Sequence, residues 1–506
     1  MNVKLNRTEN AVRNIVFGSL QKIVSILLPF VSRTVLIHYL GVKYLGLSGL
    51  FASVLGLLSL AELGVGGAIV YSMYKPVAQG DKKTICALLK FYRSMYRYIG
   101  FAVFCLGLIC IPFLKYIVTE EIPGGLNLYA LYLLYLAASV FSYFLYAYTS
   151  SLLFAHQRND VISKVGMVVN LLTFVAQMSF IIFFSSYYLY VLCIPVFAVV
   201  FNLMRYYVVK RIFPDYYPAG DLDPELKKGL LKRVKALIGT KINTVVVHSA
   251  DTVVISAFLG LTAVALYNNY YFILQSIVAF LAIAYSGMTA GLGNSLVVES
   301  GEKNLQDLRK FLFVNSWLVG WCSICLLCLY QPFMMLWLGE EYLLSFPMVI
   351  LFAVYFYILQ IRKVVINYKD AAGVWWEDRL RPYVCMVVNI VSNIVLVQYI
   401  GLIGIVISTI LSMVISIPWE TYTVFKHVFK SSSKDYYFKL SYYVAVTLVA
   451  AGLAYWGCSY FEEGIVGFLM QILICVTVPN LIFYLVYQKK VEFKYLTEIV
   501  RRFMPV

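Results

Sequence analysis

Several ionisable residues of this 506-residue chain lie inside long apolar segments, where a charge is costly. The first such segment carries Lys22 and Arg33, which are eleven residues apart and therefore share one face of a helix. A later segment carries Lys241, His248 and Asp251. Side chains of this kind can form a polar, cationic groove, which lowers the cost of moving a polar solute through hydrocarbon. The chemistry that they indicate is binding and translocation.

Glu62 lies in the inner half of the second apolar segment, where its carboxylate can pair with Lys22. In an alternative interpretation, Lys22 and Lys241 extend to the inner headgroups and Arg33 to the outer ones. The sequence leaves both interpretations open. The candidate residues for a substrate cleft are Lys22, Arg33, Glu62, Lys241, His248 and Asp251.

A second polar seam runs along the fifth and eleventh apolar segments, and we interpret it as interhelical hydrogen bonding. It consists of Asn170, Gln177, Asn389 and Asn393. Tyr143, Tyr146 and Tyr148 can stack on sugars, although tyrosine belts at the membrane interface explain them equally well.

A CxxCxxC run comprises Cys322, Cys325 and Cys328. A ferredoxin-type cluster would need a further cysteine at position 332, where Pro332 stands. The chain also has no GxxxxGK[ST] nucleotide-binding loop. We therefore predict no metal site, no catalytic residue and no cofactor, apart from a coupling ion, H⁺ or Na⁺.

The composition explains which elements position these residues. The chain is 61% hydrophobic and 13% charged, and its mean hydropathy is +0.81. Ordinary soluble domains have about 25% charged residues. Open strands cannot span lipid, so the sequence predicts an all-α polytopic membrane protein with about fourteen spans, at 14–38, 46–73, 94–116, 128–154, 164–185, 188–209, 237–260, 266–292, 312–335, 346–367, 383–400, 402–425, 438–458 and 464–487.

The distribution of lysine and arginine orients these spans. If both termini are cytoplasmic, the outer connections contain only Lys43 and Lys115, and nearly all other loop lysines and arginines lie inside. Acidic pairs such as Glu120-Glu121 mark the outer side. The net charge of +16 is therefore a signal of topology, and no nucleic-acid partner is predicted.

The chain contains an internal duplication at a shift of about 219 residues. This shift carries Lys22 onto Lys241, and Met167-Val168-Val169-Asn170 onto Met386-Val387-Val388-Asn389. Each unit has six spans, so the repeat is parallel, with two six-helix lobes around a central cleft. The predicted domains are an N-lobe at 1–218, a C-lobe at 219–432, and two extra helices with a cytoplasmic tail at 433–506.

Short motifs accompany this layout, namely Leu40-Gly41, Glu62-Leu63-Gly64, Leu259-Gly260, Tyr267-Asn268-Asn269-Tyr270 and Trp337-Leu338-Gly339. With its six, six and two helices, the chain resembles the polysaccharide transporters of the MOP superfamily, the Wzx-type flippases. The resemblance implies a MATE-like fold that alternates between inward-open and outward-open states. It also implies transport of undecaprenyl-diphosphate-linked oligosaccharides to the outer leaflet of a bacterial plasma membrane, for capsule, O-antigen or exopolysaccharide assembly.

The partners implied by the resemblance are the lipid-linked oligosaccharide, membrane lipids, and a polysaccharide polymerase with other assembly proteins. The multidrug branch of the superfamily has twelve helices, so the extra pair favours the lipid-linked branch. Lipid II flippases have more arginines in the first helix than Arg13 and Arg33 here, which favours a different lipid-linked substrate.

Two other functions remain open at this stage. One is a membrane-embedded polysaccharide polymerase or ligase, although the short outer connections offer little room to hold an acceptor. The other is a MATE-type exporter of small molecules. We expect a secondary transporter and not an enzyme.

Overall fold

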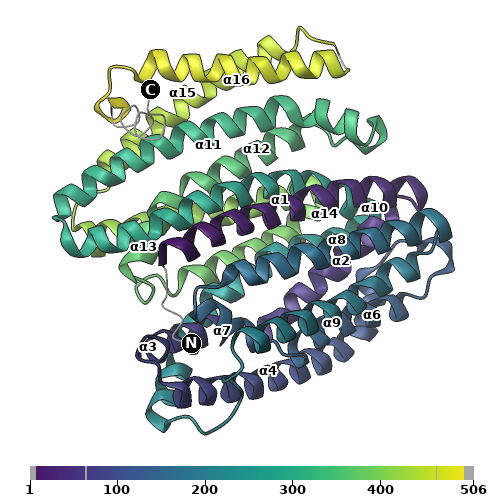
Figure 1. Cartoon of the computed structure of the whole chain (residues 1–506). Coiled ribbons are helices and arrows are strands. Elements are labelled where there is room, and N and C mark those ends of the chain that lie inside the picture. Colours follow the sequence, from purple (N-terminus) through teal and green to yellow (C-terminus); the bar gives the residue numbers. More distant parts are fainter. Residues whose placement is uncertain (1–6, 63–64, 463, 495–506) are drawn as a thin grey trace. The chain divides into compact units, whose positions relative to one another are not determined.

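The computed structural model describes residues 7–62, 65–462 and 464–494. These residues form helices joined by short connections, with no strand among them (Figure 1). The chain divides into two compact units, Met1–Ala265 and Leu266–Val506, and helix α10 runs from the first into the second. The fold class is therefore the all-α membrane architecture that the composition predicts.

Unit 1 is built from α1, α2, α3, α4, α6, α7, α8, α9 and the first part of α10. Helix α1 packs against α8, α8 against α9, α9 against α6, and α6 against α4. Capping side chains fix where helices begin: Asp81 accepts a hydrogen bond from Thr84 N at 3.1 Å at the start of α4, and Asn127 accepts from Tyr129 N at the start of α6. The bounds are α1 Arg7–Tyr39, α2 Val42–Leu58, η1 Ser59–Glu62, α3 Val65–Gln79, α4 Lys82–Cys110, η2 Ile111–Phe113, α5 Leu114–Ile117, η3 Pro123–Gly125, α6 Leu128–Phe144, α7 Thr149–Ala155, α8 Asn159–Phe184, α9 Tyr187–Ile212 and α10 Pro224–Val298.

Unit 2 is centred on α11, which packs against α12, α15 and α16. Aromatic side chains fill this core, and Trp317 and Trp321 of α11 donate hydrogen bonds to Asn480 Oδ1 and Cys475 O of α16, at 2.8 and 2.9 Å. The bounds are α11 Gly301–Trp337, η4 Glu340–Tyr342, α12 Phe346–Ile361, α13 Lys363–Ala372, α14 Arg381–Val424, the π-helix η5 Phe425–Phe429, α15 Lys434–Cys458 and α16 Ile465–Tyr487.

Ten helices of the described chain are long and apolar enough to cross a membrane, or eleven if the bent pair α6 and α7 forms one span. Helices α10 and α14 are each broken once, at Gly260 (φ 86°) and Gly401 (φ 57°). Glycine accepts this left-handed backbone without steric cost, so the helix can end and restart there. If the two halves of α10 and of α14 are counted separately, and α2 with α3 is counted as one interrupted span, the total agrees with the predicted number of about fourteen spans. The protein is therefore a multi-pass membrane protein.

Two spans of unit 1 are interrupted inside the membrane region. The 3₁₀ turn η1, with Glu62 at its end, separates α2 from α3. A bend of 57° separates α6 from α7, and Tyr146 in that bend has a left-handed φ of 56°. An interrupted helix exposes backbone polar groups, so such breaks persist only where protein or a polar cavity surrounds them.

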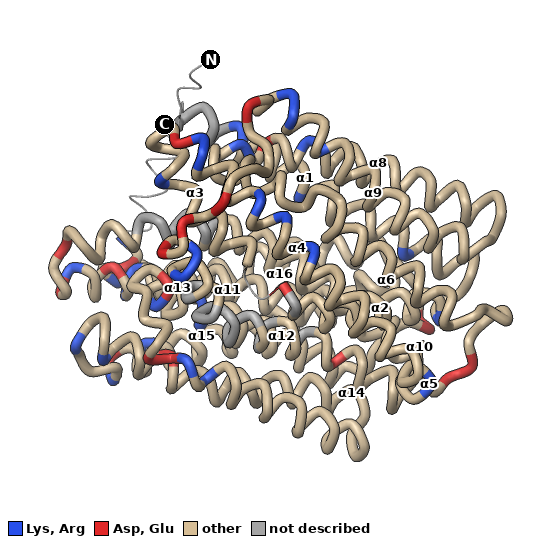
Figure 2. The backbone as a smooth tube through the Cα atoms, turned by 90° about the horizontal axis from the view of Figure 1, so that it is seen from below, with Lys and Arg blue, Asp and Glu red and all other residues tan. Residues whose placement is uncertain are grey.

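Charged residues in each unit gather near the ends of helices and leave long uncharged stretches between (Figure 2). The two contact units do not coincide with the predicted domains, because the first part of α10 packs with unit 1. The domain prediction rests on the sequence duplication and stays a prediction.

Candidate functional site

A group of buried and half-buried polar side chains lies at the two interrupted spans of unit 1. We call it the tyrosine–arginine cluster, and it comprises Glu62, Tyr92, Tyr96, Tyr143, Tyr146, Asn202 and Arg205. Its members come from η1, α4, α6, the α6–α7 bend and α9. Four segments distant in the sequence, namely η1, α4, the α6–α7 region and α9, therefore supply one polar site within apolar helices.

Glu62 and two tyrosines form a hydrogen-bonded chain in this cluster. Tyr96 donates to Glu62 Oε1, and Tyr92 donates to Tyr96 Oη at 2.8 Å. Tyr92 and Tyr96 lie one turn apart on α4 and are buried. Gly66 borders all three residues, and a Cβ there would lie 2.9 Å from Tyr92 Oη. Gly66, which has no side chain, thus leaves room for the hydroxyls of Tyr92 and Tyr96.

Arg205 on α9 is the cation of the cluster. Its side chain is 8% exposed, and its Nη2 donates to Asn202 Oδ1 at 2.5 Å and to Tyr146 O at 3.4 Å. Its Nε has no hydrogen-bond partner in the described part of the chain, and Arg205 forms no ion pair with a described residue. A buried guanidinium with an unused donor is expensive in an apolar setting. The unused N–H of Arg205 can donate a hydrogen bond to an anionic or hydroxyl-rich solute.

Tyr146 connects the helix break to the cation. The ring of Tyr146 stacks on that of Tyr206 at a centroid distance of 3.9 Å, while its backbone oxygen accepts from Arg205. A left-handed backbone in a non-glycine residue costs about 1–3 kcal/mol and is typical of functional sites. The contacts of Tyr146 with Tyr206 and Arg205 therefore stabilise the bend between α6 and α7, which interrupts the fourth predicted span.

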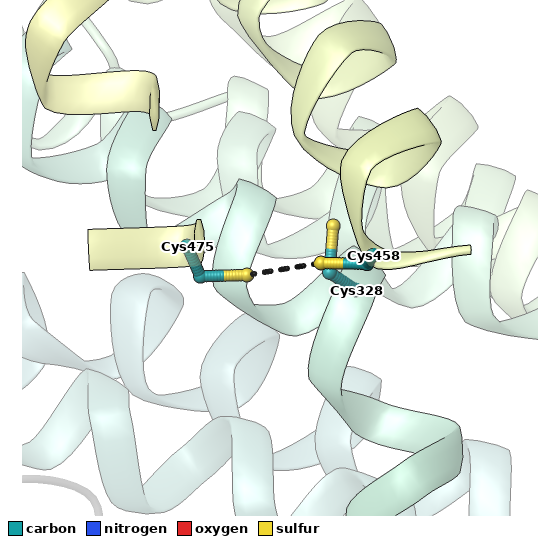
Figure 3. Close-up of side chains that lie close together, drawn as sticks. All are labelled: Cys328, Cys458 and Cys475. Atoms are coloured by element: carbon teal, nitrogen blue, oxygen red, sulfur yellow. Dashed lines mark hydrogen bonds between the residues drawn. The ribbon is translucent and has the colours of Figure 1, made fainter. Parts of the chain in front are cut away.

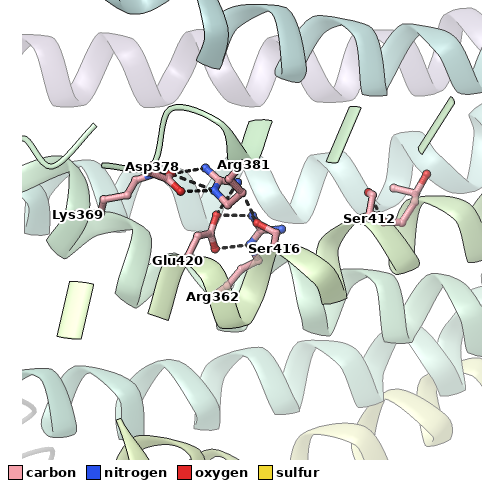
Figure 4. A network of polar contacts seen from close by, with 8 residues as sticks. Arg362, Lys369, Asp378, Arg381, Ser412, Ser416 and Glu420 are labelled. Atoms are coloured by element: carbon pink, nitrogen blue, oxygen red, sulfur yellow. Dashed lines mark hydrogen bonds and ion pairs between the residues drawn. The ribbon is translucent and has the colours of Figure 1, made fainter. Parts of the chain in front are cut away.

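A second polar group lies in unit 2, and we call it the charge network (Figure 4). Arg362 connects α12 to α13, and Arg381 begins α14. These cations surround two carboxylates, and both arginines also donate to Ser416 Oγ, at 2.8 and 2.9 Å. The network comprises Arg362, Lys369, Asp378, Arg381, Ser416 and Glu420.

The charge network is tightly paired. Arg362 Nη2 lies 2.6 Å from Glu420 Oε1 and Arg381 Nη1 lies 2.9 Å from the same oxygen. Lys369 Nζ and Arg381 Nη2 lie 2.6 and 2.8 Å from Asp378 Oδ2. Burial by itself raises the pKa of the Asp378 carboxyl, but the hydrogen bonds and charges of Arg381 and Lys369 outweigh it and hold the pKa below its ordinary value. The charged groups of this network are thus paired with one another, whereas Arg205 Nε has no partner among the described residues.

One residue of each polar group corresponds in the predicted repeat. The 219-residue shift carries Tyr143, at the end of α6, onto Arg362, at the end of α12. The two places differ in geometry: α6 and α7 meet at a bend of 57°, whereas α12 and α13 together form one candidate span.

The structure distributes the six predicted cleft residues unevenly. Glu62 belongs to the tyrosine–arginine cluster, but it forms no ion pair with Lys22, which is half-buried on α1; its carboxylate accepts from Tyr96 instead. Arg33 is half-buried near Tyr190 of α9, and Asp251 is 4% exposed on α10. The side chains of Lys241 and His248 lie outside the described residues. The cleft role of these residues remains a prediction.

The four residues of the predicted polar seam also differ in their burial and hydrogen bonding. Asn389 and Asn393 are fully buried, and Asn389 Nδ2 donates to Thr409 Oγ1 at 3.2 Å across the two halves of α14. Gln177 donates to Tyr190 O at 3.2 Å, between α8 and α9. Asn170 is exposed on α8. Three of the four side chains thus lie where they can join neighbouring helices.

The sequence contained signals for the residues that were missed. Arg205, Arg362 and Glu420 each lie inside a predicted span, and an intramembrane charge is a candidate by default. The predicted cleft residues lie instead in the first, second and seventh spans. Their partners, however, come from other helices and can be identified only in the folded chain.

Solved structures with a similar fold are transporters. The lipid II flippase MurJ in an inward closed conformation has a TM-score of 0.68 at 16% identity, over 94% of this chain and 99% of that chain. An inward-facing multidrug resistance MATE family transporter of the MOP superfamily has a TM-score of 0.61 at 14% identity, over 84% and 99%. A point mutant of the Vibrio cholerae MATE transporter VcmN has a TM-score of 0.58 at 15% identity, over 84% and 98%. No curated protein sequence matches the chain.

The sequence profile of one family matches the chain directly. It is described as polysaccharide biosynthesis protein, and the match covers residues 11–290. This segment contains the whole tyrosine–arginine cluster. Because the match spans more than half of the sequence, the chain belongs to the polysaccharide biosynthesis protein family, and its fold is that of the MOP superfamily.

Proposed function

We propose that the protein is a flippase for undecaprenyl-diphosphate-linked oligosaccharide repeat units. It moves them from the inner to the outer leaflet of a bacterial plasma membrane by alternating access, for the assembly of capsule, O-antigen or exopolysaccharide. The observation that carries the proposal is Arg205, a buried cation inside a membrane span whose Nε has no acceptor among the described residues. A saccharide hydroxyl or a diphosphate oxygen supplies that acceptor.

The surrounding side chains suit a saccharide. Tyr92, Tyr96 and Tyr143 present apolar rings with hydroxyl groups, which can pack on a sugar and hydrogen-bond to it. Family membership supports a role in polysaccharide biosynthesis, and similarity to a lipid II flippase supports a lipid-linked cargo. In this proposal both termini are cytoplasmic, and an H⁺ or Na⁺ gradient drives transport, since one charge crossing 100 mV releases about 2.3 kcal/mol.

A MATE-type exporter of small molecules is the second candidate, favoured by the MATE structures of similar fold. Those structures cover 84% of this chain, whereas the structure of MurJ covers 94%. The larger coverage supports the lipid-linked cargo.

A deletion strain tests the proposal. We expect loss of surface glycan and accumulation of a lipid-linked saccharide that faces the cytoplasm. Arg205→Ala should restore export at least about tenfold less well than the wild-type gene, the loss expected for about 1.4 kcal/mol of binding. The matched control is Arg211→Ala, an exposed arginine on the same helix.

Two outcomes would overturn the proposal. Normal surface glycan in the deletion strain, with no cytoplasm-facing intermediate, excludes this cargo. Sensitivity to cationic dyes in that strain, with unchanged glycan, supports the MATE-type exporter. Protein levels are compared by immunoblot, so that a loss of export is not confused with a loss of protein.

A further inference from the structure

Three buried cysteines from three different helices meet in the core of unit 2 (Figure 3). They are Cys328 of α11, Cys458 at the end of α15 and Cys475 of α16. Their side chains are 5%, 5% and 0% exposed, and their sulfurs all lie within 4.8 Å of one another. Only Cys328 belongs to the CxxCxxC run, so the spacing of cysteines along the chain does not reveal this group.

The sulfur positions suit a thiolate-binding metal ion. The sulfurs of Cys458 and Cys475 are 3.9 Å apart and point toward one another in Figure 3. Tetrahedral zinc has metal–sulfur bonds of about 2.3 Å, which places neighbouring sulfurs about 3.8 Å apart. Two ligands are therefore already at coordination spacing, and Cys328 needs to approach by about 1 Å at most.

A second observation points to a ligand at the same place. Gln471 lies one turn before Cys475 on α16 and is 8% exposed. Its Nε2 donates to Cys458 O at 3.4 Å, whereas its Oε1 has no hydrogen-bond partner among the described residues. A buried acceptor without a donor costs about 1–3 kcal/mol. The carboxamide oxygen is thus an unused electron-pair donor on a side chain that contacts the backbone of Cys458.

A fourth thiol lies on the same helix face as Cys328. Cys325 precedes Cys328 by one turn on α11, but its sulfur is not among the three that lie within 4.8 Å of one another. Gln471 Oε1 is therefore the candidate for the fourth coordination position.

We propose that Cys328, Cys458 and Cys475 bind one divalent zinc-class ion that fastens α15 and α16 to α11. When the ion binds, three S–H protons leave to water and three metal–thiolate bonds form, with no oxidation or reduction. A divalent ion cancels two of the three thiolate charges, so the buried site carries one net negative charge. A monovalent ion would leave two net negative charges there, which is more costly in an apolar core. This proposal departs from the sequence expectation of no metal site.

Cadmium binding tests the site, because Cd²⁺ is a spectroscopically visible substitute for Zn²⁺ at thiolates. The purified full-length protein in detergent is stripped with a chelator and titrated with Cd²⁺. Thiolate-to-metal charge-transfer absorption should saturate at one ion per chain, confirmed by elemental analysis. The triple variant C328A/C458A/C475A should lose this signal. The control C86A/C193A/C385A, which removes three other buried cysteines, should keep it.

A second measurement does not depend on the variants folding. Wild-type protein with and without Zn²⁺ is treated with N-ethylmaleimide for long enough that the buried cysteines of the zinc-free protein react, and the labelled cysteines are counted by mass spectrometry. Zinc should protect Cys328, Cys458 and Cys475 at least fivefold and leave Cys86 and Cys193 unchanged. Equal labelling with and without zinc, or a wild-type charge-transfer signal no larger than that of a folded triple variant, would overturn the proposal.

Discussion

The guanidinium of Arg362 donates two hydrogen bonds to the carboxylate of Glu420, from Nε to Oε2 at 3.1 Å and from Nη2 to Oε1 at 2.6 Å. Arg362 lies at the α12–α13 junction, and Glu420 lies in the second half of α14. This two-point contact fixes the orientation of both planar groups. It anchors the α12–α13 junction to α14.

Removing the shared carboxylate should destabilise unit 2 strongly. In Glu420→Ala, Arg362 and Arg381 lose a common partner while remaining buried, and breaking a buried pair in this way typically costs about 3–5 kcal/mol. We expect a clear fall in the thermal unfolding temperature in detergent. The control is Asp435→Ala, which breaks the exposed pair with Arg309 and should cost at most about 1 kcal/mol. Equal shifts in the two variants would contradict the role of the network.

The charge network should also make stability depend on pH in the acidic range. The pKa of Asp378 is lowered in the folded state, so its contribution is fully present above the ordinary aspartate pKa of about 3.9. That contribution is lost as the pH falls through the lowered pKa of the folded state. Asp378→Asn should therefore be less stable than wild type at neutral pH, and the difference should shrink below about pH 4. Unfolding temperatures measured at several pH values check this, and a difference independent of pH would refute it.

Gly46 should not tolerate a side chain. Helix α2 approaches the restart of α10 so closely that a Cβ on Gly46 would lie 2.0 Å from Leu261 O, and backbone cannot yield easily. Gly46→Ala should lower stability by about 1–3 kcal/mol or more, as overpacking does. Gly67 of α3 has no atom within 4 Å of the corresponding position, so Gly67→Ala serves as the control. A tolerated Gly46→Ala, with the unfolding temperature of wild type, would show that these segments do not meet as described.

The hydroxyl of Tyr96 should matter more than its ring. Tyr96→Phe removes the donor to Glu62 and leaves a half-buried carboxyl without it, a loss of about 1–3 kcal/mol. We expect a lower unfolding temperature and, under the proposed function, reduced glycan export at normal protein level. Tyr98→Phe is the matched control, because Tyr98 lies on the same helix and is 71% exposed. Full export by Tyr96→Phe would separate this hydroxyl from transport.

The sequence by itself determined that the chain is an all-α, multi-pass membrane protein. Apolar length and the scarcity of charge suffice for that, because lipid imposes the same requirement on every span whatever its neighbours. Gly260 and Gly401 could likewise be recognised as ends of spans, since an unstrained turn needs a residue without a Cβ.

Only the tertiary structure decided which polar residues work together. Glu62 was predicted to pair with Lys22, but in the structure its carboxylate, which is half-buried, accepts a hydrogen bond from Tyr96 of another helix. Arg205, the Arg362–Glu420 pair and the three meeting cysteines also depend on contacts between helices far apart in the sequence. Hydropathy reports how each helix meets lipid. It carries no information about which faces of two helices meet each other, and in this protein those faces determine the sites.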